Sequence, residues 1–467
     1  MSQARHRGST TRFAVKLLLL VVLICAGVYL LLLHDLNRTL KWRLSRLHAA
    51  GVPRTWAEVI PPPIPDRDNA AIIYAQAFKQ LYLTSDDREA LKSFLNTRQP
   101  VSRDALQAPV QLVLARNGAA LGLAKQGGAR PGCRWSVDWS DPPPLVLLTY
   151  LGEVRTCVRL LAADAIMAAR ERNAGRALES LRAAIVMSAR ATANPTLQPL
   201  LSGARDEVTA LDALPRVLEE INLDAPACRG FAQELEGLDF RQDYPRAVAQ
   251  EALVGLWCFD AVQRDRGTIK DILEYGVNAN GPPASAVWLY LSPAAKLARL
   301  GEEITYVELM QEALHLAHEP YRQVAARYQR LDENMERARW YQLIIRNFAA
   351  TNAEIGPTNE QTAILFERAL ALRNAMQVAL ALKAYRAERR AYPNSLDALR
   401  EYLGGTSAAP EMRRSRIHGW KLPADPFSGK DFGYRRQGAS FVLYGWGEDL
   451  RDDGGQPDRD MVWEFRR

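Results

Sequence analysis

Four side chains of the kind that bind metal ions lie close together in one stretch of the chain: Glu308, Glu312, His315 and His318. On a helix, Glu312 and His315 would share a face because they are three residues apart, so they could ligate one metal ion. Di-iron helical bundles use such a Glu-x-x-His pair twice, and no second copy occurs here. The sequence favours the alternative, an ordinary solvent-exposed helix face, because a motif of this length often arises by chance.

Motifs of the common catalytic folds are missing from the sequence. It contains no G-x-S-x-G nucleophile turn, no G-x-x-x-x-G-K-[ST] phosphate loop, no G-x-G-x-x-G and no H-E-x-x-H. We therefore predict a protein that is not an enzyme. The alternative is a membrane-bound metalloenzyme with a site in the helical body at Glu312 and His315.

The composition is that of a folded protein, with 48% hydrophobic and 24% charged residues, so a sizeable core is expected. The formal net charge is +7. Much of this excess lies in the first 46 residues and in the final Arg466–Arg467. A basic segment beside a membrane anchor typically meets anionic lipid, so we predict no nucleic-acid partner.

Residues 13–33 are apolar except for Lys16, which lies near one end and can reach the membrane surface. At about 1.5 Å per residue, such a helix crosses a hydrocarbon core of roughly 30 Å. We predict a transmembrane helix at 13–33, after a basic tail at 1–12, that is kept as a signal-anchor because no small-x-small cleavage site follows it. The predicted location is a bacterial inner (plasma) membrane, crossed once, with the N-terminus cytoplasmic and the body extracytoplasmic.

The segment 34–65 is expected to hold a basic amphipathic helix followed by a proline-rich linker. Leucines and cations recur there at helical spacing, at Leu36, Leu40, Leu44 and Leu47 and at Arg38, Lys41, Arg43 and Arg46. Such a helix can lie on a membrane and bind anionic lipid headgroups. Alternatively, it is a helical extension packed on the body. The linker Pro61-Pro62-Pro63-Ile64-Pro65 is expected to be a stiff extended spacer.

Residues 66–356 are predicted to form an α-helical body, because apolar residues recur at helical spacing and strand signals are nearly absent. The segments 102–124 and 196–221 are each expected to be one helix. The stretch 160–191 resembles a tetratricopeptide helical hairpin in the spacing of its small residues, but no regular period of about 34 residues follows. The predicted fold class is mainly α, with a bundle or solenoid-like body.

Five cysteines are present, and Cys25 lies inside the apolar run. The others, Cys133, Cys157, Cys228 and Cys258, are widely spaced without a C-x-x-C pair, so a zinc site is not expected. In an extracytoplasmic body these four could form two disulfides in three possible pairings. Buried free thiols are the alternative, and Cys133, in a Gly/Pro loop, is expected to be exposed.

The segment 357–467 has a different pattern. A long alanine-rich helix at 358–390 and a short one around Leu396–Tyr402 are followed by alternating aromatic and β-branched residues, which predict strands at 432–436, 441–444 and 461–463. The sequence reads A-Y-x-x-x-x-x-x-Y-P-x-S-L-x-x-L, D-P-F-x-G-K-x-F-x-Y, F-x-L-Y-x-x-G and D-x-x-D-D-G-G. Over about 100 residues this order resembles the C-terminal globular part of the major pseudopilin of type II secretion systems.

The resemblance implies a small α+β domain whose acidic loop binds Ca²⁺. Asp449 and Asp460 fall where the family's carboxylate ligands fall, and Gly454–Gly455 would let the backbone turn and offer carbonyl oxygens. Calcium takes six to eight oxygen ligands, partly from carboxylates. The alternatives are a solvated acidic turn or a loop neutralised by Arg451 and Arg459. Further candidate ligands are Asp452, Asp453 and Asp458.

The chain departs from pseudopilins at its start, where the apolar run has no prepilin-peptidase site and lies more than 300 residues upstream of the resembling part. We therefore do not expect it to polymerise into a pseudopilus. The predicted function is a non-catalytic, membrane-anchored scaffold or interaction protein of the bacterial cell envelope. Its predicted partners are the lipid bilayer and other envelope proteins.

Overall fold

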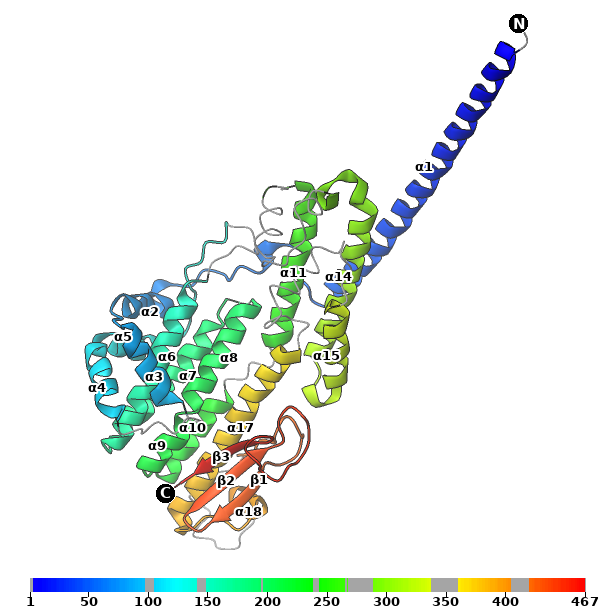
Figure 1. The fold of residues 1–467 in the computed structure, drawn as a ribbon. Helices are drawn as coiled ribbons and strands as arrows, with labels where there is room; N and C mark the ends of the chain where they lie inside the picture. Colours follow the sequence, from blue (N-terminus) through cyan, green and yellow to red (C-terminus); the bar gives the residue numbers. More distant parts are fainter. Residues whose placement is uncertain are drawn as a thin grey trace.

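The structure is a computed structural model of the chain. It describes residues 3–96, 105–140, 148–194, 196–237, 243–264, 267, 289–336, 360–404 and 420–466. Most of these residues are helical and one small sheet lies near the C-terminus, which confirms the predicted mainly α class. Figure 1 shows one long helix projecting from an elongated body, with the sheet at the other end of that body.

Helix α1 runs without a break from Gln3 to Ala49, so the predicted membrane segment and the predicted basic helix are parts of one helix. Its apolar part is long enough to cross a membrane and is not buried in the protein. The helix ends where Gly51 adopts a φ of 105° and the Val52 N–H donates to the Leu47 carbonyl, the usual way in which a glycine closes a helix.

The second half of α1 packs on the body, mainly along helix α14 (Lys296–Ala317). Leu40 and Leu47 are buried in the core that includes α14, and Leu36 and Leu44 are half-buried against it. The leucine face of the basic helix is therefore covered by protein. Of the two interpretations of this segment, the structure shows the helical extension packed on the body.

The rest of the helical body, as far as the structure describes it, consists of short and medium-length helices, several of which lie side by side in Figure 1. They are α2 (Ala70–Lys79), α3 (Ser85–Leu95), α4 (Gln107–Arg116), α5 (Gly118–Gly128), α6 (Tyr150–Arg170), α7 (Ala174–Ala191), α8 (Leu197–Leu211), α9 (Leu214–Glu220), α10 (Ala225–Glu236), α11 (Asp243–Arg264) and α15 (Tyr321–Glu336). Helices α6 and α7 form the predicted hairpin, and α8 packs against both.

Two segments predicted to be single helices are each broken in two. The first breaks at Asn117, whose buried side chain accepts the Tyr82 N–H at 2.9 Å and donates to the Tyr82 carbonyl at 3.0 Å. This long-range pair fixes the turn between α4 and α5. The second breaks between α8 and α9, where Pro215 in the first turn of α9 has no N–H to continue the helix.

Helix α17 (Glu360–Arg389) lies between the helical body and the sheet (Figure 1) and is buried along much of its length. Leu372 and Leu380 belong to the core shared with α6, α7 and α10, whereas Ile364 and Ala371 belong to the core shared with α11 and α14. The first helix of the predicted C-terminal domain is thus packed into the body that precedes it.

The three predicted strands are confirmed and form one antiparallel sheet in the order β1-β2-β3, after the short helix α18 (Leu396–Gly404). Phe441 lies opposite Phe465 with ring centroids 4.6 Å apart. Gly433 lies opposite Tyr444, and a Cβ there would come within 2.0 Å of the tyrosine ring, so only glycine fits. The strands are β1 (Gly433–Gln437), β2 (Ser440–Gly445) and β3 (Met461–Phe465).

Candidate functional site

The acidic loop connects β2 to β3, and the buried Asp460 organises it. The Asp460 carboxylate accepts the backbone N–H groups of Gly455 at 2.5 Å, Gln456 at 3.3 Å and Asp453 at 3.4 Å. Gly455 has a φ of 78°, and a Cβ there would lie 2.9 Å from the Tyr444 ring. The loop backbone therefore folds around one carboxylate. Burial raises the pKa of the neighbouring Tyr444, and the negative charge of Asp452 raises it further.

Asp453 is the second carboxylate inside the loop. Its Oδ1 pairs with the Arg459 guanidinium at 3.1 Å, while its Oδ2 is buried without a hydrogen-bond partner. Buried carboxylate oxygens are normally satisfied. Arg459 thus neutralises part of the loop charge, which is one of the alternatives predicted from the sequence. The Oδ2 atom of Asp453 is left without a donor.

The other three aspartates of the predicted calcium site lie apart from this pair. Asp449 and Asp452 each accept the N–H of the residue two positions later, at 3.1 and 3.0 Å, as in Asx turns. Asp458 is exposed. Within the described ranges, no group of three or more His, Cys, Asp or Glu side chains is arranged to hold a metal ion. The structure therefore places Asp453 next to Asp460, whose carboxylate accepts the Asp453 N–H, and leaves the other three candidates exposed.

A further carboxylate beneath the loop escaped the sequence reasoning. Asp425, the first residue of the D-P-F-x-G-K stretch, is fully buried and accepts the N–H groups of Phe427, Ser428 and Trp446 at 3.1 to 3.2 Å. It joins the turn before β1 to the point where the acidic loop begins. The available signal was an aspartate in a Pro/Gly turn, which often caps nearby backbone N–H groups.

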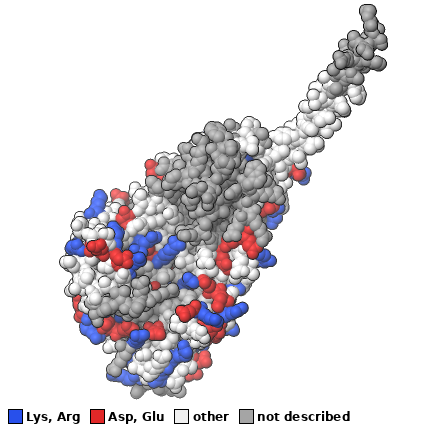
Figure 2. Space-filling view, in the orientation of Figure 1, with Lys and Arg blue, Asp and Glu red and all other residues white. Residues whose placement is uncertain are grey.

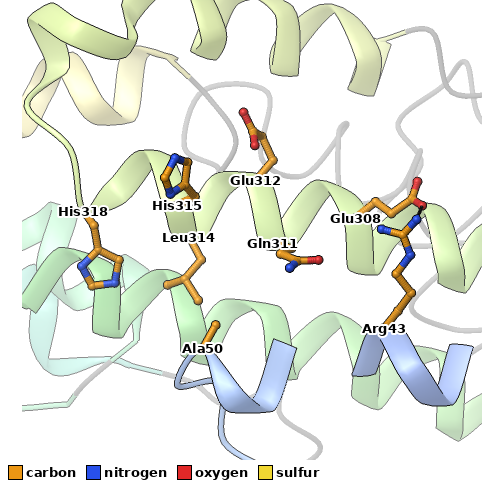
Figure 3. Close-up of a pocket in the computed structure, with 8 residues that line it drawn as sticks. All are labelled: Arg43, Ala50, Glu308, Gln311, Glu312, Leu314, His315 and His318. Atoms are coloured by element: carbon orange, nitrogen blue, oxygen red, sulfur yellow. Dashed lines mark ion pairs between the residues drawn. The ribbon is translucent and has the colours of Figure 1, made fainter. Parts of the chain in front are cut away.

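The four candidate metal ligands of the sequence, Glu308, Glu312 and His315 on α14 and His318 just after it, line a groove of about 610 Å³ together with Arg43 and Ala50 (Figure 3). Glu308 pairs with Arg43 of α1 at 2.6 Å. Glu312 accepts two hydrogen bonds from Arg327 of α15, at 2.7 and 3.0 Å. Both carboxylates thus join α14 to a neighbouring helix, and a metal ion bound by Glu312 and His315 would lie close to the positive charge of Arg327.

All five cysteines are free thiols. Burial raises the pKa of Cys157, Cys228 and Cys258 to about 12, which keeps them protonated and unreactive. Cys133 is half-buried rather than exposed as expected, and burial raises its pKa to about 12 as well. The structure therefore agrees with buried free thiols rather than with two disulfides.

The cations of the basic helix have two different environments. Arg43 is held by Glu308, whereas Arg38, Lys41 and Arg46 remain exposed. On the face of the body in Figure 2, the described Lys and Arg side chains are interspersed with Asp and Glu. Exposed ion pairs of the described residues include Arg182 with Glu234 and Arg368 with Glu448. Interspersed charges of both signs are typical of an ordinary solvated surface.

Comparison of the chain with protein families, with curated proteins and with solved structures finds no match.

Proposed function

We propose that the chain is a non-catalytic scaffold or interaction protein of the bacterial cell envelope, anchored in the plasma membrane by α1 with its body on the extracytoplasmic side. One observation carries the proposal. Helix α1 continues unbroken from an unburied apolar part into the leucines that are buried against α14. Such a helix holds the body at a fixed distance from the bilayer, which is the mechanical role of a scaffold.

The position of the C-terminal sheet supports an interaction role. In Figure 1 the sheet lies at the end of the body opposite to the free end of α1. An extracytoplasmic module there would face away from the membrane, where other envelope proteins can reach it. We propose that this module, with its pseudopilin-like motif order, contacts such a partner. The guanidinium of Arg327 beside Glu312 repels a metal cation, and we therefore favour this function over a metalloenzyme with a site at Glu312.

Membrane anchoring predicts how the chain behaves in alkaline carbonate. We expect the full chain to stay in the membrane pellet, and the double variant Leu20→Arg/Leu23→Arg to be released. Each arginine in the middle of a membrane helix costs about 2.5–3.5 kcal/mol. Leu112→Arg is the matched control, because Leu112 is 60% exposed on the body, and it should stay in the pellet. Extraction of the unaltered chain by carbonate would contradict the proposal.

Calcium binding by the acidic loop is a separate proposal, supported by the unpartnered Oδ2 of Asp453. If Ca²⁺ enters beside Asp453 and Asp460, it competes with Arg459. We then expect Arg459→Gln to tighten calcium binding, and Asp453→Asn to weaken it by about tenfold or more, since carboxylates supply much of the affinity. The exposed Asp458 provides the matched control, Asp458→Asn. Calorimetric titration with Ca²⁺ is applied in detergent to the unaltered full chain and to the three variants. If neither the unaltered chain nor Arg459→Gln gives any heat, the proposed calcium site is rejected.

A further inference from the structure

Helices α1 and α14 run side by side in the same direction. At one end of their shared groove, Arg43 of α1 pairs with Glu308 of α14 at 2.6 Å. At the other end, Ala50 lies across from Leu314 and His315 (Figure 3). A step of seven residues along α1 thus matches a step of six or seven along α14. The two helices therefore run in the same direction and stay in step along the groove.

This register places the beginning of α14 level with the end of the apolar span. Helix α14 begins at Lys296, twelve residues before Glu308. Twelve residues before Arg43 is Leu31. Both steps correspond to a rise of about 18 Å. Leu33, the last residue of the predicted span, is half-buried against the core that α1 shares with α14.

The turn that leads into α14 is held firmly in place. Arg299 donates to the carbonyls of Tyr290 and, at 2.7 Å, of Ser292, and its guanidinium lies 5.8 Å from the centre of the Tyr290 ring. Tyr290 is buried, and its hydroxyl donates to Glu302. Leu289, in contrast, is 53% exposed and Lys296 is exposed. This turn therefore presents an apolar side chain and a cation outward, level with the end of the predicted membrane span on α1.

We propose that residues 289–296 form a second membrane contact, in the headgroup region of the leaflet from which α1 emerges. Leu289 inserts toward the acyl chains, and Lys296 meets lipid phosphates. The inference rests on the proposed role of α1 as a membrane span. As a consequence, the body contacts the bilayer at two points, and its orientation relative to the membrane is fixed.

The test uses the full chain reconstituted in vesicles of phosphatidylcholine and phosphatidylglycerol, with a fluorescent dye on a single accessible cysteine. In a background of Cys25→Ser and Cys133→Ser, the dye is placed by Leu289→Cys or, as a matched exposed apolar position on α4, by Leu112→Cys. Lipids carrying a nitroxide near the glycerol should reduce the fluorescence at position 289 at least about twofold, because interfacial side chains lie within reach of such a quencher. They should leave position 112 unchanged.

A third labelled position separates the two possible failures. Native Cys25 lies inside the apolar run, so in a Cys133→Ser chain its dye should be quenched by nitroxides placed deep in the acyl chains. Quenching at Cys25 without quenching at position 289 would overturn the second contact and leave the span intact. Equal quenching at positions 289 and 112 would also overturn it. No quenching at Cys25 would overturn the span itself.

Discussion

Arg373→Met is expected to lower the free energy of unfolding by about 3–5 kcal/mol, since it removes the guanidinium that compensates a buried carboxylate charge. The Arg373 guanidinium of α17 makes two hydrogen bonds of 2.8 Å to Glu207 of α8. The two side chains are only 3% and 1% exposed. This pair fastens the predicted C-terminal domain to the helical body, so its loss should loosen both.

The measurement is the midpoint of urea unfolding of the full chain in detergent. Arg368→Met is the matched control, because Arg368 on the same helix pairs with Glu448 at 2.6 Å but both side chains are about half exposed. An exposed pair contributes about 1 kcal/mol or less. The double variant Arg373→Met/Glu207→Leu should recover much of the loss, since it removes both charges. Equal losses in Arg373→Met and Arg368→Met would contradict this account.

Leu47→Ala is expected to lower the free energy of unfolding by about 2–5 kcal/mol, because it leaves a cavity where α1 meets the body. Leu47 is completely buried. The loss should be local at first, with α1 after Leu40 separating from α14. Hydrogen–deuterium exchange of the full chain in detergent should therefore rise in both helices.

Trp42→Ala is the control for Leu47→Ala. Trp42 lies on the same part of α1 and is 52% exposed, with Arg46 stacked over its ring at 4.9 Å. Its removal should leave the exchange of α14 unchanged. If Leu47→Ala also leaves the exchange of α14 unchanged, α1 is not fixed to the body through this face. The proposal that α1 holds the body in a fixed position at the bilayer would then be contradicted as well.

Local patterns in the sequence predicted much of the fold. The apolar run at 13–33 predicted a helix of spanning length, and the strands around Phe441 and Trp463 followed from aromatic and β-branched alternation. The long helix before Tyr392 ends within a residue of its predicted end. In each case, neighbours along the chain decide the structure.

Features that depend on distant residues could not be predicted. Glu207 and Arg373 are 166 positions apart, and nothing in their local sequence marks them as partners. Asn117 breaks a regular helical pattern because it binds the backbone of Tyr82, 35 positions away. Similarly, spacing alone could not show which loop aspartates turn inward, because that depends on backbone N–H groups gathered around Asp460.

The side of the membrane occupied by the body is tested most directly by thiol labelling in bacterial spheroplasts. In a Cys25→Ser/Cys133→Ser background, a membrane-impermeant maleimide should label Asp458→Cys in intact spheroplasts, because Asp458 is exposed in the acidic loop at the end of the body away from the membrane helix. It should label Ser9→Cys, in the basic tail, only after lysis. Labelling of Ser9→Cys in intact spheroplasts, with Asp458→Cys protected until lysis, would contradict the account.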